Sequence, residues 1–317
     1  MLPEKRLELV HFQITKMCNL HCWFCGQWGS KGFFSDSEGS PMTYADWERV
    51  TASLSRIKPL PSVILWGGEP LISPDFGKIV SLLHGKGFEL GIVTNGVFID
   101  KWADLLKSCF KVIYVSIDGP ENIHDKIRGK GVYKKVMSNL KLLSGRNAKL
   151  VIMSVMSPEL SECIESFADE LESVKPNELY LQDMISLEKS EADAYADWLY
   201  KNFGQKANEI YSWNTKGFPT DEKTISKHSF NIIYKKHGEK AENSFCLSPF
   251  RHAHIAWNGS VMYCTDFYDF SAGNVKTADI IDIFNNDLSE NFRNEVYCGN
   301  CPSCAHCSWK NNKTFYL

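Results

Sequence analysis

Short apolar runs alternate with helix-like segments over the first two thirds of this chain, and this rhythm constrains its fold more than any other feature. The apolar runs span residues 8–15, 62–68, 89–96, 111–119, 148–156 and 177–184. The helix-like segments that follow them lie near residues 44–56, 75–86, 100–108, 133–143, 159–171 and 190–203. Strands that alternate with helices favour parallel pairing through right-handed crossovers. Six such units predict an α/β fold, a partial (β/α)6 TIM-like barrel, because a closed barrel needs about eight.

The cysteines gather at the two ends of the chain. Of the eleven, three stand in the sequence CNLHCWFC after the first predicted strand, and six stand in the last quarter. The first group is Cys18, Cys22 and Cys25, and the second is Cys246, Cys264, Cys298, Cys301, Cys304 and Cys307. Cys109 and Cys163 lie between the groups and are expected to be small buried apolar residues. A disulfide framework would be spread more evenly, so this pattern predicts metal binding at both ends.

Charge and hydropathy argue against several classes of protein. The formal net charge of -3 gives no electrostatic reason to expect nucleic acid as a partner. No run approaches the ~20 apolar residues that a membrane-spanning helix needs. The N-terminal sequence MLPEKRLELVHF lacks the apolar region of a secretory signal. We therefore expect a cytoplasmic protein that binds neither nucleic acid nor a membrane.

Unusual residues follow four consecutive predicted strands. They are the first cysteine group, WGGEP at residues 66–70, TNG at 94–96 and SIDG at 116–119. In parallel α/β folds the carboxyl ends of the strands share one edge, and active sites lie there. GGEP alone is also compatible with a plain turn. Because it ends the strand next to the one that carries the cysteines, it indicates a site.

Three thiols leave one coordination position of a metal site without a cysteine. Structural zinc sites and ferredoxin-type clusters take about four protein ligands. A zinc site completed by His21 or His11 is the alternative interpretation. That alternative gives GGEP and its register with the cysteines no role.

The spacing C-x3-C-x2-C, with Phe24 before its last cysteine, and the tetrapeptide GGEP together resemble the radical S-adenosylmethionine (SAM) superfamily over residues 10–184. The resemblance implies that Cys18, Cys22 and Cys25 hold a [4Fe-4S] cluster, whose remaining iron takes the amino and carboxylate groups of SAM. Reductive cleavage of SAM would then give a 5′-deoxyadenosyl radical that abstracts a hydrogen atom from the substrate. A flavodoxin- or ferredoxin-type protein would be the reductant.

The same resemblance assigns SAM contacts to residues at the strand ends. Gly67, Gly68 and Glu69 would receive the methionine ammonium, because a carboxylate makes a strong charge-assisted hydrogen bond with it. Phe24 would lie near the adenine. The other candidates are Asn95 as a wall of the site, and Ser116, Asp118 and Arg128 as contacts for the ribose or carboxylate. HDKIRG at residues 124–129 resembles the branch of the family that has a C-terminal cysteine domain.

The last quarter of the chain resembles the SPASM and Twitch auxiliary iron-sulfur domains. The likeness lies in the spacing Gly259-x4-Cys264, in GNV at residues 273–275 and in the helix-like TADIIDIFNND. The predicted domains are a radical SAM barrel at 1–203, a linker or insertion at 204–244 and a small cysteine-rich domain at 245–317. Within the linker, SFNIIYKK is interpreted as a short strand or a helix.

The number of cysteines in this domain leaves its metal content open. The final run has the spacing C-x2-C-x2-C-x2-C, which can wrap an iron-sulfur cube but differs from the C-x2-C-x5-C-x3-C of usual SPASM domains. One arrangement is a single auxiliary cluster held by Cys246, Cys264 and two cysteines of the final run. The other is two clusters, one on Cys298, Cys301 and Cys304 and one on Cys246, Cys264 and Cys307, each with a further non-cysteine ligand. A zinc ribbon is the structural alternative.

Oxidation assisted by an auxiliary cluster would also need a base. Asp266 is the candidate catalytic residue, since CTDFYD resembles the cysteine-aspartate pair of anaerobic sulfatase maturases. Here Thr265 intervenes, which on a strand moves the next side chain to the other face. An aspartate in a turn or helix cap is the plain alternative. Tyr263, Tyr268, His252 and His254 are the rival groups.

The resemblance suggests a substrate class. Members with such a C-terminal domain often modify ribosomally made peptides, so oxidation, crosslinking or epimerisation of a peptide is the leading hypothesis. Dehydrogenation of a sugar or cyclitol alcohol is the alternative. An iron-sulfur electron carrier is a third, although a carrier does not need GGEP. Because the first strand begins near Glu8, we expect no N-terminal leader-recognition domain.

Overall fold

The computed structural model describes residues 2–28, 39–183, 189–207, 227–235, 246–264 and 269–306. Its strands are β1 Leu9–Thr15, β2 Ser62–Gly67, β3 Leu90–Thr94, β4 Phe110–Ser116, β5 Lys149–Val155, β6 Glu178–Gln182, β7 Asn231–Lys235, β8 His252–Ile255, β9 Ser260–Met262 and β10 Gly273–Asn274. Its α-helices are α1 Tyr44–Leu54, α2 Phe76–Gly85, α3 Ile99–Cys109, α4 Glu121–Arg128, α5 Val132–Lys141, α6 Pro158–Leu171, α7 Lys189–Phe203, α8 Ser248–Arg251, α9 Ile280–Asn285 and α10 Asp287–Tyr297. Short 3-10 turns are η1 Pro70–Ile72, η2 Glu172–Val174 and η4 Pro302–His306.

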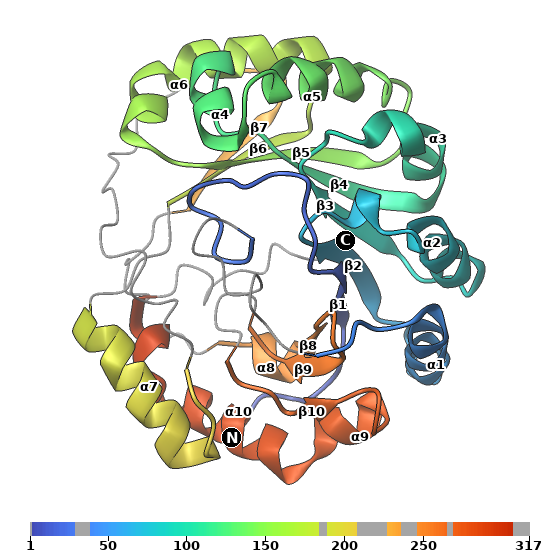
Figure 1. The fold of residues 1–317 in the computed structure, drawn as a ribbon, viewed down its shortest axis with the longest axis vertical. Helices are drawn as coiled ribbons and strands as arrows, with labels where there is room; N and C mark the ends of the chain where they lie inside the picture. Colours follow the sequence, from blue (N-terminus) through green and yellow to red (C-terminus); the bar gives the residue numbers. More distant parts are fainter. Residues whose placement is uncertain are drawn as a thin grey trace.

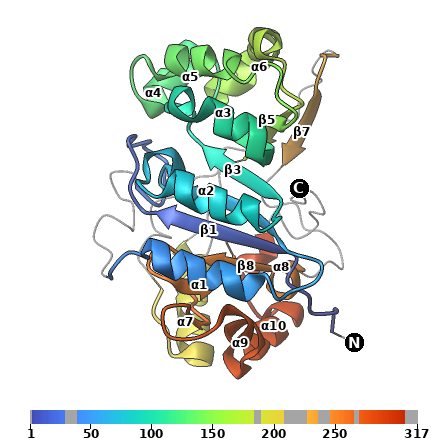
Figure 2. The same ribbon diagram turned by 90° about the vertical axis from the view of Figure 1, so that its right-hand side faces the viewer.

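One curved sheet organises the molecule (Figure 1). Its strand order is β10-β9-β8-β1-β2-β3-β4-β5-β6-β7, and every pair from β8 to β7 is parallel. Helices α1 to α6 cover its outer side (Figures 1 and 2). The two ends of the sheet are not hydrogen-bonded to each other in the described residues. The predicted partial barrel is therefore confirmed.

Both faces of the sheet are buried, which explains the almost continuous apolar runs of its strands. Val10, Phe12 and Ile14 of β1 belong to the large core beneath the helices. Leu9 belongs to a separate cluster on the opposite face, together with Ile64 of β2 and others. The alternation along the strand thus divides β1 between two cores.

Local signals explain where the predicted helices begin. Thr43 and Asp46 form a reciprocal capping box at the start of α1. Ser157 accepts the backbone N–H of Leu160 at the start of α6, and Pro158 fills the first helical position. The sequence prediction did not include α4, the eight-residue helix that follows β4 and ends at Arg128.

Helix α7 occupies a place that its order in the chain does not predict. It follows β6 but packs against the C-terminal region, beside α10 (Figure 1). The indole N–H of Trp198 donates to Glu295 of α10 at 3.0 Å, and its ring lies 6.2 Å from that of Phe292. The buried residues of α7 are Tyr195, Trp198 and Leu199, of which Trp198 makes these two contacts.

The C-terminal region continues the sheet of the barrel. Strand β8 pairs with β1 in parallel, with Leu9 opposite His252 and Phe12 opposite Ile255. The segment that was interpreted as a strand or a helix contains β7, parallel to β6. The sheet therefore extends across the predicted boundary at residue 245, and the three predicted domain ranges stay predictions.

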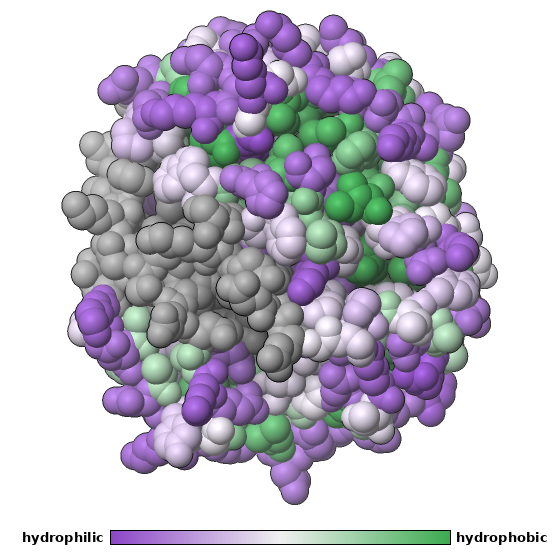
Figure 3. Space-filling view, viewed as in Figure 1, coloured by the Kyte–Doolittle hydropathy of each residue, from purple (hydrophilic) through white to green (hydrophobic). Residues whose placement is uncertain are grey.

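The surface is mainly polar on the face shown in Figure 3, where hydrophilic residues surround a smaller area of apolar ones. No helix in the described part of the chain is both long enough and apolar enough to span a membrane.

Candidate functional site

The first cysteine group forms a loop directly after β1. The backbone N–H of Cys25 donates to the carbonyl of Cys22 at 2.9 Å, which closes the turn. Two further N–H groups point at sulfur, from Leu20 to Cys18 Sγ and from Trp28 to Cys25 Sγ, each at 3.4 Å. Backbone donors of this kind stabilise thiolates and are found around iron-sulfur clusters.

The GGEP turn is fastened to the beginning of this loop. The N–H of Gly68 donates to the carbonyl of Thr15 at 2.9 Å, and that of Glu69 donates to the carbonyl of Met17 at 2.8 Å. A Cβ atom on Gly68 would lie 2.1 Å from the Met17 oxygen, and one on Gly67 would lie 2.3 Å from the Thr15 oxygen. The two backbones approach so closely that only glycine fits at both positions.

Glu69 turns its carboxylate into the protein. Its Oε1 accepts the N–H of Leu71 at 3.0 Å and the hydroxyl of Thr94 at 2.7 Å, and its Oε2 accepts the N–H of Asn95 at 2.7 Å. The side chain is fully buried, and this burial raises the pKa of Glu69 to about 7, although the three hydrogen bonds act in the opposite direction. Glu69 therefore joins the ends of β2 and β3.

Asn95 joins the end of β3 to the cysteine loop. Its Nδ2 donates to Asn19 Oδ1 at 2.9 Å and lies 3.8 Å from Cys18 Sγ. Its Oδ1 accepts the N–H of Val97 at 3.0 Å. Three strand ends, the GGEP turn and the cysteine loop are thus one hydrogen-bonded unit. Thr94 of the TNG motif belongs to it, and so does Asn19, which the sequence did not single out as a site residue.

Asp118 and Arg128 form a buried ion pair beside the loop. Arg128 Nε donates to Asp118 Oδ2 at 2.6 Å, while the N–H of Val155 donates to Asp118 Oδ1 at 3.0 Å. The guanidinium carbon lies 5.9 Å from the centre of the Phe24 ring. Burial opposes the charge of Arg128, but Asp118, Cys22 and other neighbours outweigh it and raise the pKa of Arg128. The loop therefore has a permanent cation next to it.

His124 of α4 completes this group and was missed as a site residue. Its Nδ1 accepts the backbone N–H of Asp118 at 3.1 Å, and burial lowers the pKa of His124 to about 4. A neutral imidazole thus fixes the backbone that positions Asp118. Ser116, the remaining candidate from β4, is partly exposed and lies opposite Met153 of β5.

The histidines proposed for the alternative zinc site are engaged elsewhere. His21 Nδ1 lies 3.2 Å from the carbonyl oxygen of Trp28. His11 stacks on His254 inside the barrel, with ring centres 4.3 Å apart. Neither contact directs an imidazole at the three thiols.

Four of the six C-terminal cysteines come together. Cys301 and Cys304 lie in η4 or directly before it, and they pack in the same core as Cys246 and Cys264. The hydrogen bond with Cys301 is the largest cause that raises the pKa of Cys304, followed by burial and by the nearby Cys246 and Cys264. Cys298 is exposed at the end of α10. Cys307 and Asp266 lie outside the described residues.

The chemistry of the donor groups around the cysteine loop fits a cysteine-ligated cluster. No group of His, Cys, Asp and Glu side chains within the described ranges already stands at metal-binding geometry. Burial raises the pKa of Cys18 to about 12 and also raises that of Cys22. A bound metal favours the thiolate form of such groups. Clustered thiols, N–H groups aimed at sulfur and the Arg128 charge are what a cysteine-ligated cluster requires.

Comparisons with known proteins match a family model to the barrel and another to the C-terminal cysteine region. The model of the "Radical SAM superfamily" matches residues 12–171, and that of an "Iron-sulfur cluster-binding domain", SPASM, matches residues 246–308. SAM and iron-sulfur clusters are therefore the cofactors of this chain.

Relatives of several activities share this architecture. Fe-coproporphyrin III synthase of Methanosarcina barkeri is 22% identical over 96% of this chain and 82% of its own length. The cysteine-type anaerobic sulfatase-maturating enzyme of Clostridium novyi is 26% identical over 75% of this chain and 70% of its own. Streptococcus suis SuiB, solved bound to its precursor peptide SuiA, has a TM-score of 0.62 at 16% identity, covering 97% of this chain and 72% of SuiB. The structural likeness supports the predicted fold.

Proposed function

Because the chain belongs to the radical SAM superfamily, we propose that this enzyme modifies a ribosomally synthesised peptide by hydrogen-atom abstraction. The outcome would be an oxidation, a crosslink or an epimerisation. The observation that carries the proposal is the fastening of GGEP and Asn95 to the cysteine loop, since it holds three thiols at the edge of an open barrel. A sulfatase maturase and a structure with a precursor peptide among the similar proteins support the peptide.

The residues at the strand ends would hold the cofactors. Cys18, Cys22 and Cys25 would ligate the [4Fe-4S] cluster, which supplies the electron that cleaves SAM. The glycines of GGEP leave room for the methionine end of SAM close to the backbone. Arg128, kept charged by Asp118, would face the carboxylate of SAM and would also stabilise the thiolates. Glu69 would act mainly by fixing β2 and β3, with its remaining lone pairs available to the ammonium.

The C-terminal site would hold one auxiliary cluster. Cys246, Cys264, Cys301 and Cys304 would be its ligands, because Cys304 makes a hydrogen bond with Cys301 and lies close to Cys246 and Cys264. Cys298 and Cys307 would then be spare. Asp266 stays a predicted base.

A tetrapyrrole is the second candidate substrate. The observation that favours it is the relative named Fe-coproporphyrin III synthase, which matches 96% of this chain. An AdoMet-dependent heme synthase of the same organism, 26% identical over 94% of this chain, also favours it.

The test begins with anaerobic reconstitution of the wild type and of a C18A/C22A/C25A variant. With dithionite and SAM, the wild type should form 5′-deoxyadenosine and the variant should not. The wild type is then co-expressed with the short open reading frames next to its gene. The masses of the peptides are measured after synthesis in light water and in heavy water. A mass loss or a deuterium gain on one peptide supports the proposal. Unchanged peptides together with formation of iron coproporphyrin III or of heme from an added tetrapyrrole precursor would instead establish the second candidate.

A further inference from the structure

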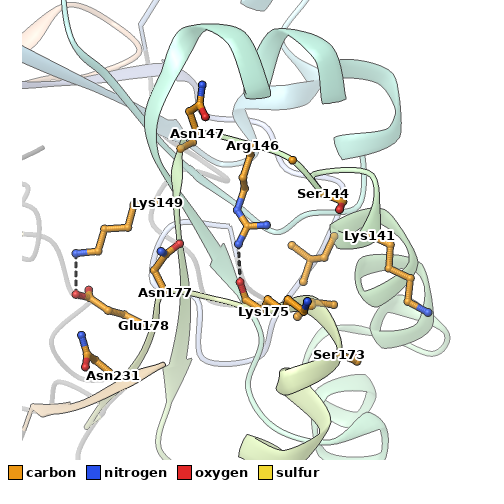
Figure 4. A pocket seen from close by; sticks show the side chains of 14 residues that line it. Lys141, Ser144, Arg146, Asn147, Lys149, Ser173, Lys175, Asn177, Glu178 and Asn231 are labelled. Atoms are coloured by element: carbon orange, nitrogen blue, oxygen red, sulfur yellow. Dashed lines mark hydrogen bonds and ion pairs between the residues drawn. The ribbon is translucent and has the colours of Figure 1, made fainter. Parts of the chain in front are cut away.

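A concave surface lies at the opposite end of the barrel from the cysteine loop. Its cavity of about 770 Å³ is bordered by the loop before β5, the loop before β6 and the first residue of β7. Figure 4 shows the side chains of these segments around one opening. All strands of the barrel run in the same direction, so this cavity faces away from the strand ends that carry GGEP and Asn95.

Positive charge dominates the lining of the cavity. Lys141, Arg146, Lys149 and Lys175 all border it (Figure 4). Its one carboxylate, that of Glu178, accepts from Lys149 Nζ at 2.7 Å. Within the described residues that line the cavity, no acidic side chain remains for the other three cations. A chain with a net charge of -3 thus has a local excess of positive charge here.

Arg146 shows that this charge is not balanced internally. Its Nη2 donates to the carbonyl of Lys175 at 2.6 Å, and its Nη1 donates weakly to that of Leu143 at 3.4 Å. These are neutral acceptors, and Nε is buried with no hydrogen-bond partner in the part of the chain that the structure describes. Burial without a neighbouring anion lowers the pKa of Arg146. A half-buried cation of this kind is stabilised when an anion binds beside it.

The form of the cavity indicates the kind of anion. Lys141, Lys149 and Lys175 are exposed, and Asn147 and Asn177 add exposed amides between them. Such a wide, open wall suits several separated carboxylates on an extended chain better than one compact ion. We propose that this surface binds an acidic segment of the peptide substrate, remote from the residue that reacts. The proposal rests on the peptide function proposed above.

The length of the barrel determines how far apart the acidic segment and the reacting residue of such a peptide must be. Strand β5 has seven residues and connects the cationic cavity to the SAM end of the barrel. At ~3.3 Å per residue its length is roughly 23 Å. An extended peptide at ~3.3–3.6 Å per residue needs about seven residues or more between its acidic segment and its reacting residue.

Calorimetric titration of the reconstituted full-length chain tests the proposal, with neither SAM nor reductant present. The probe is a capped peptide of alternating glutamate and glycine, about twelve residues long. We expect saturable binding that weakens as salt is added. The variant K141E/K175E should bind at least roughly tenfold more weakly. The matched control K86E/K206E changes the same net charge at exposed positions away from the cavity, and it should bind like the wild type.

Three outcomes would overturn the proposal: no binding, equal weakening in both variants, or displacement of the probe by an equal concentration of inorganic pyrophosphate. The first would exclude the site, the second would indicate general surface attraction, and the third would indicate a site for small anions. The titration is independent of catalysis. Probe binding without any peptide modification would contradict the proposed function and would leave an anion-binding surface that has no peptide substrate. Modification that K141E/K175E leaves unchanged would contradict only this inference.

Discussion

Single residues determine how closely the GGEP turn meets the cysteine loop. At Gly68 the backbone of one loop touches that of another, and even a methyl group has no space. Glu69 accepts three hydrogen bonds that hold the ends of β2 and β3 together, and Asn95 donates to Asn19 of the cysteine loop. The site therefore depends on close backbone contacts, which the side chains of Glu69 and Asn95 keep in place.

Gly68→Ala should therefore be costly although it adds only one carbon atom. The new Cβ would lie 2.1 Å from the carbonyl oxygen of Met17, so the cysteine loop must shift. We expect a loss of about 1–3 kcal/mol in the free energy of unfolding, as for other overpacked sites, and a lower iron content after reconstitution. Gly85→Ala is the control, since nothing lies within 4 Å of its Cβ position. Equal behaviour of the two variants in urea unfolding and iron analysis would contradict this account.

The C-terminal cysteines allow a second prediction about residues. In a background without Cys18, Cys22 and Cys25, replacing Cys301 by alanine should remove the remaining iron, because Cys301 is buried among the other thiols. Replacing the exposed Cys298 should leave that iron in place. Iron and sulfide per chain are measured after anaerobic reconstitution. If Cys298→Ala also loses its iron, the arrangement with two clusters gains support.

Among the elements, α7 shows how tertiary contacts override order in the chain. It follows β6, as a crossover helix would, yet its apolar face lies on α10 and near η4. The aromatic side chains of Trp198, Phe203 and Phe292 meet there. Helix α7 thereby connects the barrel to the cysteine-rich region.

The contribution of this contact to stability can be measured with two substitutions in α7. Trp198→Ala removes a buried indole and its hydrogen bond to Glu295, and should cost about 3–5 kcal/mol of unfolding free energy. Tyr200→Ala alters an exposed residue and should cost less than about 0.5 kcal/mol. The two are compared by urea denaturation. A small effect at Trp198 would show that α7 is held by other contacts.

Across the whole molecule, buried histidines link stability to pH. Burial is the largest cause that lowers the pKa of His11 to about 3 and that of both His124 and His252 to about 4. Burial also lowers the pKa of His254, with His11 and His252 adding to the effect. Lowered values in the folded state mean that only the unfolded chain takes up protons as pH falls below its ordinary histidine pKa of about 6.5. The free energy of unfolding should therefore decrease as the pH falls from about 6.5 to about 4.

Replacing one of these histidines should make the dependence on pH less steep. His11→Phe keeps an aromatic ring against His254 and removes one titrating group. The slope of unfolding free energy against pH should fall by up to about 1.4 kcal/mol per pH unit below pH 6. Urea unfolding at several pH values measures it, with the exposed His84→Gln as the control. An unchanged slope in His11→Phe would mean that its protonation does not differ between the two states.

Prediction from the sequence was most successful where the signals are local. Apolar periodicity and caps such as Thr43 and Ser157 depend on a few neighbouring residues, so the six strands of the barrel and their helices were predictable. The three cysteines and GGEP could be placed together because parallel strands bring their carboxyl ends to one edge. The helix before Arg128 was missed, although its residues had been noted as a motif.

The sequence by itself determined the partial barrel, the cysteine loop beside GGEP and the second group of thiols. Only the tertiary structure decided that Glu69 faces inward, that Asp118 binds Arg128, and that Cys246 and Cys264 meet Cys301 and Cys304. It also decided that β8 continues the barrel, where the N–H of Trp257 reaches Gln13 across 244 positions of sequence. The physical reason is that these contacts join segments far apart in the chain. Their partners are selected by the packing of the whole molecule, which no short stretch of residues specifies.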